Sequence, residues 1–346
     1  MKRYKRYKDY GFFDQDIRLS KLSQLGDPLE KLNDGIDFEK FRNFLEESLF
    51  TEPKGPGGRP PFDYVLMFKI LILQRYYNLS DEQVEYQIND RMSFMRYLDL
   101  TIADDIPDSR TVWAFREQIT NLGLVEKLFD LFLTELNLLG LIVNEGKIVD
   151  ASFVETPKQR NSKAVNEQIK NGDTAELFND NPHRKAQKDT DARWVKKNNV
   201  NYFGYKNHIK TDAKSKIITK YHVTDASVHD SNATDILLDE NDKGEPFYAD
   251  SAYTGESQEN IISEKEMINQ VCEKGYRNKP LTDEQKSSNT EKSRVRSRVE
   301  HIFGFMEQSM NQMYIHTVGI KRATAAIGLM NLTYNMYRKI QLLAIS

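Results

Sequence analysis

Residues 147–150 read KIVD, and residues 247–250 read FYAD. Each stretch is a short apolar run that ends on an aspartate, which predicts buried strands at 147–149 and 247–249 with Asp150 and Asp250 at their ends. Strands of one sheet can bring two such carboxylates together. Carboxylate oxygens that stay partly open suit Mg²⁺ or Mn²⁺, and a pair of these ions is the usual clamp for in-line phosphoryl transfer.

A third carboxylate, Glu300, lies in a long helix that is predicted to begin near residue 292. At roughly 100° per residue, Glu300 shares a helix face with Arg296 and Gly304. A different face carries the apolar residues Val295, Val299, Ile302, Met306, Met310 and Met313. Glu300 is therefore expected to project away from the core beside Arg296. The alternative is an ordinary exposed ion pair between residues four apart, which contributes only a few tenths of a kcal/mol.

The chain around these carboxylates is predicted to alternate strands and helices. Apolar and polar side chains alternate over residues 217–223, as is typical of a half-buried strand. The other predicted elements are a strand at 202–210 that pairs with a strand at 217–224, a helix at 231–238, a strand at 246–249, a helix at 258–265 and a strand at 271–274. Residues 155–200 are mostly polar, and we expect a mobile excursion there.

Residues 11–140 have a helical periodicity, with start signals at Ser80 and Asp108. Ser80 and Gln83 have the spacing of a capping box. The helix after Asp108 presents Arg110, Arg116 and Trp113, which is typical of a helix-turn-helix-like DNA reader. A plain helical bundle with a basic surface is an equal alternative. The change of pattern predicts two domains, at 1–140 and 141–346.

Composition sets wide bounds on the function. The 346 residues, 39% hydrophobic and 29% charged, are ordinary for one large or two modest globular domains. The single cysteine, Cys272, excludes an intramolecular disulfide and a Cys-rich zinc module; a zinc site at His208, His222 and His229 is a weaker alternative. No apolar stretch resembles a signal peptide or a bilayer span. We therefore expect a cytoplasmic protein without a membrane partner.

Positive charge is gathered in three stretches, although the net charge is −3. Residues 184–220 contain 11 Lys and Arg against three Asp, and Trp194 lies among them. Such a mixture of cations and aromatic rings suits phosphate contact and base stacking. The other two stretches are a possible arm at residues 1–8 and residues 274–298 around Glu300. The near-neutral total is therefore compatible with DNA as a partner.

Five stretches together resemble one family of enzymes. They are GRPPFDYVLMFKILILQ at 58–74, IVDASFVETPKQRN at 148–161, YADSAYTG at 248–255, RVRSRVEHIFG at 294–304 and NLTYNMYR at 331–338. In this order they are similar to the DDE transposases of bacterial insertion sequences, particularly the insertion-sequence-five branch. The resemblance runs nearly the full length of the chain.

The resemblance implies a fold, a chemistry and a set of partners. The fold is an α/β ribonuclease H-like core, a mixed sheet flanked by helices, after an all-helical DNA-binding domain at 1–140. Asp150, Asp250 and Glu300 would form the catalytic triad and bind two Mg²⁺ (or Mn²⁺) ions per active site. The enzyme would be an endonuclease and polynucleotidyl transferase in transposition. Its partners would be double-stranded DNA, as terminal inverted repeats and target, and a second copy of the chain in a nucleoid-associated homodimer.

The expected DNA contacts come from the basic stretches and from the family motifs. They are Arg110, Arg116, Arg160, Arg184, Lys185, Arg193, Trp194, Lys196, Lys197, Tyr253, Arg294, Arg296 and Arg298. The family signature has a tyrosine and a lysine where this chain has Ser293 and Glu307, so Arg294 and Arg298 are expected to replace the phosphate contact of that lysine. Two alternatives stay open: a metal-dependent nuclease without strand transfer, and an inactive DNA-binding regulator.

Overall fold

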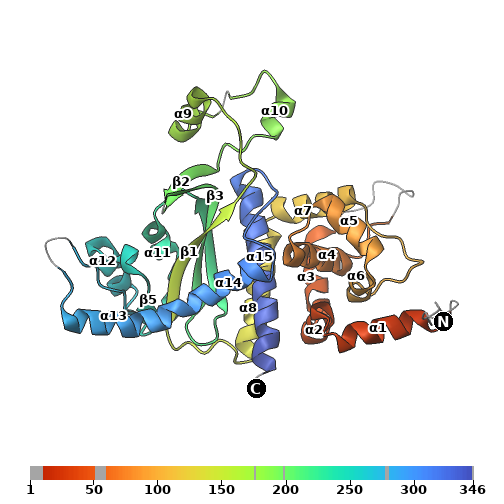
Figure 1. Cartoon of the computed structure of the whole chain (residues 1–346), viewed down its shortest axis with the longest axis horizontal. Helices are drawn as coiled ribbons and strands as arrows, with labels where there is room; N and C mark the ends of the chain where they lie inside the picture. The colour runs from red at the N-terminus through yellow and green to blue at the C-terminus, as the bar shows by residue number, and fades with distance from the viewer. Residues whose placement is uncertain (1–10, 51–59, 175–176, 198, 277–279, 345–346) are drawn as a thin grey trace, which may run out of the picture.

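The computed structural model describes residues 11–50, 60–174, 177–197, 199–276 and 280–344. The predicted arm at residues 1–8 lies outside these ranges. Figure 1 shows a group of N-terminal helices and a sheet on opposite sides of the long C-terminal helix α15 (Ile320–Leu343). No helix in the described ranges is long and apolar enough to span a bilayer.

The N-terminal region is all-helical, as predicted. The capping box is present, because the Ser80 side chain accepts from the Gln83 N–H and the Ser80 N–H donates to the Gln83 side chain. Asp108 caps its helix by accepting from the Thr111 N–H at 2.7 Å. The helices are α1 (Asp14–Gln24), α2 (Pro28–Gly35), η1 (Phe38–Phe41), α3 (Arg42–Leu49), α4 (Tyr64–Tyr77), α5 (Asp81–Asp90), α6 (Met92–Tyr97), α7 (Ser109–Asn121) and α8 (Leu124–Leu138).

The C-terminal region is built on a mixed sheet. Its strands are β1 (Lys147–Glu155), β2 (Arg193–Lys197), β3 (Val200–Asp212), β4 (Ile218–Asp225), β5 (Pro246–Tyr248) and β6 (Ile268–Asn269). β3 pairs antiparallel with β1, β2 and β4, whereas β5 lies parallel to both β1 and β6. The antiparallel pairing of β3 with β4 confirms the two strands predicted around the turn at 212–216.

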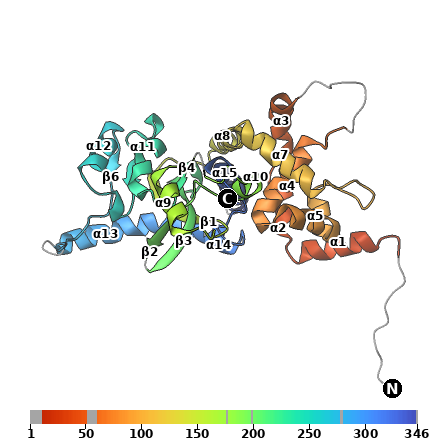
Figure 2. The same ribbon diagram turned by 90° about the horizontal axis from the view of Figure 1, so that it is seen from above.

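Helices cover both faces of the sheet (Figure 2). Successive side chains of a strand point to opposite faces, so Ile148 joins the large core that includes α15, and Val149 joins a smaller core with Leu237 and Ile262. The smaller core lies beneath α11 (Thr234–Leu237) and α12 (Glu256–Glu264). A mixed sheet flanked by helices after a helical region confirms the predicted fold class.

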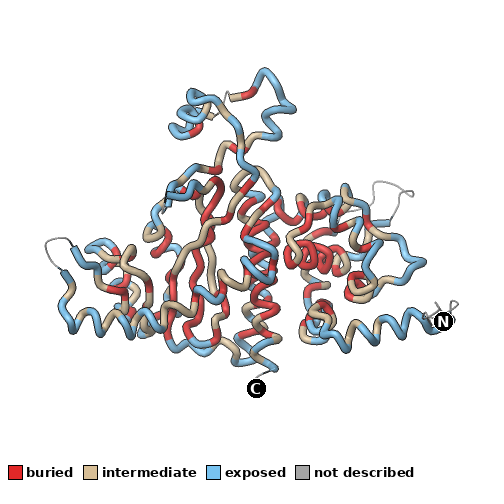
Figure 3. Tube along the Cα trace, viewed as in Figure 1, coloured by how far each residue is buried: buried red, intermediate tan, exposed pale blue. Residues whose placement is uncertain are grey.

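Helix α15 connects the two regions. Its middle, residues 323–339, is mostly buried (Figure 3), and Tyr337 stacks on Tyr76 of α4 with ring centroids 4.2 Å apart. On its other side, the Asn331 and Asn207 amides hydrogen-bond each other, which attaches α15 to β3. The domain boundary at residue 140 stays a prediction, and one hydrophobic core extends across it.

Three local predictions need correction or refinement. The strand expected at 271–274 is absent, and the short β6 at Ile268–Asn269 takes its place beside β5. The long helix is interrupted into α13 (Asp283–Arg296), η5 (Ser297–Val299) and α14 (Glu300–Gln308). The polar excursion carries α9 (Lys163–Asn171) and α10 (Pro182–Ala186), which project from one end of the sheet (Figure 1).

Buried Asp189 anchors the returning end of this excursion. Its carboxylate accepts from the Tyr205 hydroxyl of β3 at 2.9 Å and from the Gly319 N–H at the start of α15 at 3.2 Å. Asp191 accepts from the next N–H, that of Ile320, at 2.8 Å. Two carboxylates therefore satisfy backbone donors at the N-terminus of α15 and favour its helix dipole.

Candidate active site

Asp150 lies inside a strand, which corrects the strand predicted to end at residue 149. β1 continues to Glu155 because each of its residues, from Lys147 on, pairs with β3, and Asp150 lies opposite Ile209. The run of apolar side chains ends before Asp150, whereas the backbone pairing with β3 continues to Glu155. Asp150 Oδ1 accepts the Ala151 N–H at 2.8 Å, and the side chain is 17% exposed.

Asp250 follows β5, which is parallel to β1, and caps the short helix η4 (Ser251–Tyr253). Its Oδ1 accepts the Ala252 N–H at 2.8 Å. Tyr253 is buried, and its hydroxyl makes no hydrogen bond within the described ranges. Burial, with the charges of Asp150, Asp230 and Asp250, raises the pKa of Tyr253 well above its usual value. The buried Tyr253 side chain is therefore close enough to three carboxylates to feel their charges.

Arg296 links the third candidate to the first. Its Nη1 donates to Asp150 Oδ2 at 3.1 Å, and its Nη2 donates to Glu300 Oε1 at 2.6 Å. Glu300 projects from the start of α14 with 61% of its side chain exposed, as the helical angle predicted. Gly304, one turn later, has open space where a Cβ would lie. The ion pair between Arg296 and Glu300, which was the alternative explanation for Glu300, is thus present. Arg296 also contacts Asp150 of β1.

The surroundings of Asp150 disfavour its charged form. Burial raises its pKa to about 6, and the nearby charges of Asp250 and Asp230 add to that rise. The Ala151 N–H and the Arg296 guanidinium act in the opposite direction. A buried carboxylate beside other carboxylates is an environment that a bound cation relieves.

Asp230 is a neighbour that the sequence analysis missed. It begins η2 (Asp230–Ala233), and the Lys206 Nζ of β3 lies 2.7 Å from its Oδ1. The same ammonium donates to the Val228 carbonyl. The predicted helix at 231–238 begins one residue after Asp230, and an aspartate at that position is typical of a helix N-cap and not of a functional site. Only the packing of η2 against η4 brings it near Asp150 and Tyr253.

The donor set suits a hard cation, but Arg296 supplies the positive charge in this structure. Asp150, Asp250 and Glu300 offer carboxylate oxygens, the ligands that Mg²⁺ and Mn²⁺ prefer. Within the described residues, no three His, Cys, Asp or Glu side chains are close enough to hold one ion. The same finding covers the zinc alternative, in which the rings of His208 and His222 are 6.4 Å apart.

The structure separates the expected DNA contacts into exposed and buried groups. Arg116 is buried and pairs with Asp81, and its Nη1 also donates to Gln74 at 3.1 Å, so it faces the helical core. Tyr253 is buried near the carboxylates. Arg193 donates to three consecutive carbonyls of its own loop. The exposed candidates are Arg110, Arg160, Arg184, Lys185, Trp194, Lys196, Lys197 and Arg294, whereas Arg296 and Arg298 are half-buried.

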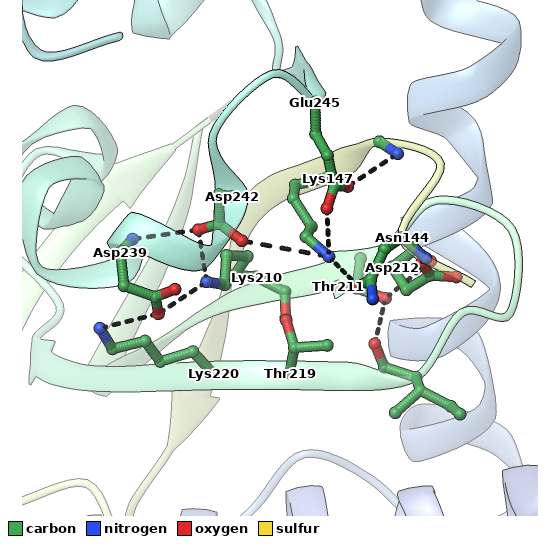
Figure 4. A network of polar contacts seen from close by, with 12 residues as sticks. Asn144, Lys147, Lys210, Thr211, Asp212, Thr219, Lys220, Asp239, Asp242 and Glu245 are labelled. Carbon is green, nitrogen blue, oxygen red and sulfur yellow. Dashed lines mark hydrogen bonds and ion pairs between the residues drawn. The ribbon is translucent and has the colours of Figure 1, made fainter. Parts of the chain in front are cut away.

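A buried charge network holds the strand that carries Asp150 (Figure 4). Lys210 Nζ of β3 lies 2.6 Å from Asp242 and 2.9 Å from Asp239. Lys147 Nζ at the start of β1 lies 3.3 Å from Glu245, which directly precedes β5. Because these pairs join β1, β3 and the segment before β5, they fix the positions of the strands that lead to Asp150 and Asp250.

Two protein-family models match the chain. Residues 143–336, more than half of the chain, match the model described as transposase DDE domain. Residues 17–118 match the model described as transposase domain (DUF772). No solved structure matches the chain. The first match includes Asp150, Asp250 and Glu300, and the second includes most of the N-terminal helices.

Proposed function

The chain belongs to the family of transposase DDE domains, and from that premise we propose that it cuts DNA at the ends of a mobile element and joins those ends to target DNA. Its mixed sheet flanked by helices is the ribonuclease H-like fold of such enzymes. One observation carries the proposal: Arg296 joins Asp150 to Glu300 beside Asp250, although Asp150 and Arg296 are 146 residues apart.

In this proposal Asp150, Asp250 and Glu300 would hold two Mg²⁺ or Mn²⁺ ions. When bound, the ions activate the attacking oxygen and stabilise the leaving oxygen. Asp150 is held by β1 and Asp250 by the cap of η4, so two ligands are rigid. Glu300 is exposed and contacts Arg296, so it would be the ligand that adjusts its position. Arg296 would be free to bind a DNA phosphate, a group that a guanidinium binds well.

The two chemical steps need no covalent bond to the protein. In cleavage, water attacks the phosphorus and the P–O3′ bond breaks, which leaves a 3′-hydroxyl on the element and a 5′-phosphate on the flanking strand. In strand transfer, this hydroxyl forms a new P–O bond at a target phosphate, and the 3′-oxygen of the target strand leaves. Each step replaces one P–O bond by another, so no external energy source is required.

The finer assignments follow from the resemblance and are part of the same proposal. They are the insertion-sequence-five branch, terminal inverted repeats and target DNA as substrates, a homodimer, and DNA contacts at the exposed candidate residues. The eight exposed candidates project from α7, from the excursion with β2, and from α13. Arg116 and Tyr253 are dropped as direct contacts because both are buried.

A strand-transfer assay tests the proposal. Labelled duplexes that carry the inverted repeats flanking the coding region are incubated with the protein, target DNA and Mg²⁺. We expect cleaved ends and joined product, and neither with Asp250→Ala or with EDTA. Cleavage without joining supports the nuclease alternative, and binding without cleavage supports the inactive regulator. Unchanged cleavage by Asp250→Ala, in a protein of normal unfolding midpoint, rules out the triad.

A further inference from the structure

Three cations from distant parts of the chain meet at the turn between β3 and β4. Lys216 belongs to the turn itself, Arg298 to η5, and Arg338 to the last third of α15. All three are half-buried. The site lies at the end of β3 that follows Ile209, the partner of Asp150.

Hydrogen bonds to the turn's own carbonyls hold these residues. Arg298 Nη1 donates to the Ala213 carbonyl at 2.8 Å, and Arg338 Nε donates to the Ser215 carbonyl at 2.6 Å. The Tyr334 hydroxyl donates to the Lys216 carbonyl at 2.9 Å. Two guanidinium groups are therefore held at one turn by neutral carbonyl oxygens, which do not neutralise their positive charges.

The turn at residues 212–216, which these side chains contact, is held by hydrogen bonds of its own. Buried Asp212 accepts the N–H groups of Ser215 at 2.6 Å and of Lys214 at 3.1 Å. Lys216 has a φ of 62°, in the left-handed region. Such a conformation costs free energy in a residue other than glycine, unless the surrounding contacts hold it. The contacts to Ala213, Ser215 and Lys216 supply that support.

Among the described residues, no carboxylate pairs with the cations of the cluster. Lys216, Arg298 and Arg338 make no ion pair within the described ranges, whereas nearby Lys214 pairs with Glu145 at 2.9 Å. Burial lowers the pKa of Lys216, and the charges of Arg338 and Arg298 lower it further. Like charges held together without a carboxylate favour an anionic ligand.

The distance between Asp150 and the turn indicates which part of a bound DNA strand the cluster would contact. Ala213 follows the end of β3 and lies four positions after Ile209, which is roughly 13 Å along an extended chain at about 3.3 Å per residue. That length is about four base-pair steps of 3.4 Å. Arg298 also precedes Glu300 by two residues, so a strand that passes the carboxylates can reach the turn.

We propose that Lys216, Arg298 and Arg338 form a phosphate clamp that holds the DNA backbone a few nucleotides from the bond that is cut. This inference rests on the proposed function and adds Lys216 and Arg338 to the expected DNA contacts. The clamp recognises phosphodiester groups and not bases, since its members are cations fixed by backbone carbonyls. Its contribution to affinity is therefore independent of DNA sequence.

The salt dependence of DNA binding tests the clamp. A fluorescently labelled DNA duplex is titrated with the full chain, without divalent metal, between about 50 and 200 mM salt. Lys216→Gln is expected to weaken binding for every duplex sequence and to lower the slope of log K against log salt by about 0.9. Lys243→Gln is the matched control, because exposed Lys243 already pairs with Glu266 at 2.7 Å and should keep the wild-type slope.

A stability measurement separates a lost contact from a damaged fold. The Lys216 ammonium makes no hydrogen bond within the described residues, and its neutralisation removes repulsion from Arg298 and Arg338. The thermal unfolding midpoint of Lys216→Gln is thus expected at or above that of the wild type. Arg338→Gln also loses the hydrogen bond to the Ser215 carbonyl. A loss of DNA affinity in this variant therefore counts as a lost contact only if its thermal unfolding midpoint is unchanged.

The outcomes distinguish the clamp from the proposed function. If the wild type cleaves DNA and Lys216→Gln has an unchanged slope and affinity, the clamp is wrong and the proposed function stands. If Lys216→Gln weakens binding as expected, but the wild type forms no cleaved or joined product with Mg²⁺, the clamp stands and the proposed function is wrong.

Discussion

The guanidinium of Arg296 lies 3.1 Å from a carboxylate oxygen of Asp150, although 146 residues separate the two in the chain. The other end of the same guanidinium contacts Glu300 at 2.6 Å. A single side chain thus holds together two of the three candidate metal ligands. Arg296 places a positive charge beside these carboxylates, which favours their charged forms.

Replacement of Arg296 by Gln should strengthen metal binding and weaken catalysis. A hydrogen bond between charged groups contributes about 1.5–3 kcal/mol, so a cation that no longer competes with Arg296 should bind about ten- to hundredfold more tightly. Mn²⁺ titration followed by electron paramagnetic resonance, without DNA, measures this change. Exposed Arg294→Gln is the control, and equal Mn²⁺ affinities of all three proteins would show that Arg296 does not compete.

Replacement of Asp150 by Asn should abolish cleavage and stabilise the free protein at alkaline pH. Burial raises the pKa of Asp150 to about 6, so the charged form is penalised above pH 6 and the penalty is absent below the unfolded value near 4. The free energy of unfolding should rise by up to about 3 kcal/mol at pH 8 and change little at pH 4. Urea denaturation measures it.

The control for Asp150 is Glu300→Gln, because Glu300 is 61% exposed. Its free energy of unfolding should stay within about 0.5 kcal/mol of wild type, while its cleavage activity is lost. A destabilised Asp150→Asn protein at pH 8 would contradict the prediction.

His208 should make the protein sensitive to acid. The ring is buried, its Nε2 lies 2.8 Å from the Thr224 hydroxyl, and its Nδ1 makes no hydrogen bond within the described residues. Burial lowers its pKa to about 4. Since protons then bind the unfolded chain first, the His208 contribution to stability is complete above pH 6.5 and is lost as the pH falls towards 4, about 3 kcal/mol in all.

Comparison of His208→Gln with wild type isolates this effect. The difference between their free energies of unfolding should shrink as the pH falls from 7.5 to about 4.5, measured by urea denaturation. His183→Gln, at an exposed position of α10, should follow the wild type throughout. A difference that does not vary with pH would exclude His208 as the cause.

Lys210 should be essential for stability, and its neighbour Lys220 should not. Lys210 and Asp242 are both nearly inaccessible, and Lys210→Met leaves a buried carboxylate without its main partner, which costs about 3–5 kcal/mol. Lys220 contacts Asp239 at 3.4 Å at the exposed edge of the same network, and Lys220→Met should cost less than about 1 kcal/mol. Thermal unfolding compares the two, and similar losses would contradict the role assigned to burial.

Local sequence patterns were enough to predict many elements. The capping signals at Ser80 and Asp108 depend on nearest neighbours, and both are present in the structure. The strand predicted before Asp225 is also present, but its burial does not alternate, since Ile217 and Ile218 are both buried and residues 219–222 are all half-buried. The exposure of Glu300 followed from helical angles, because they hold even though η5 interrupts the helix just before it. The strand predicted to end at Asp150 was wrong, because residues 150–155 are held by pairing with β3 and not by their own apolar pattern.

The sequence by itself determined the fold class, the order of the carboxylates and the likeness to a transposase, since these depend on periodicity and on short motifs. Only the tertiary structure decided which charges meet. Arg116 and Tyr253 are buried in the fold. Asp230 lies near enough to Asp150 to affect its pKa, and Lys216 lies near Arg298 and Arg338. The physical reason is that Coulomb interactions and burial depend on distances across the fold, which spacing along the chain does not contain.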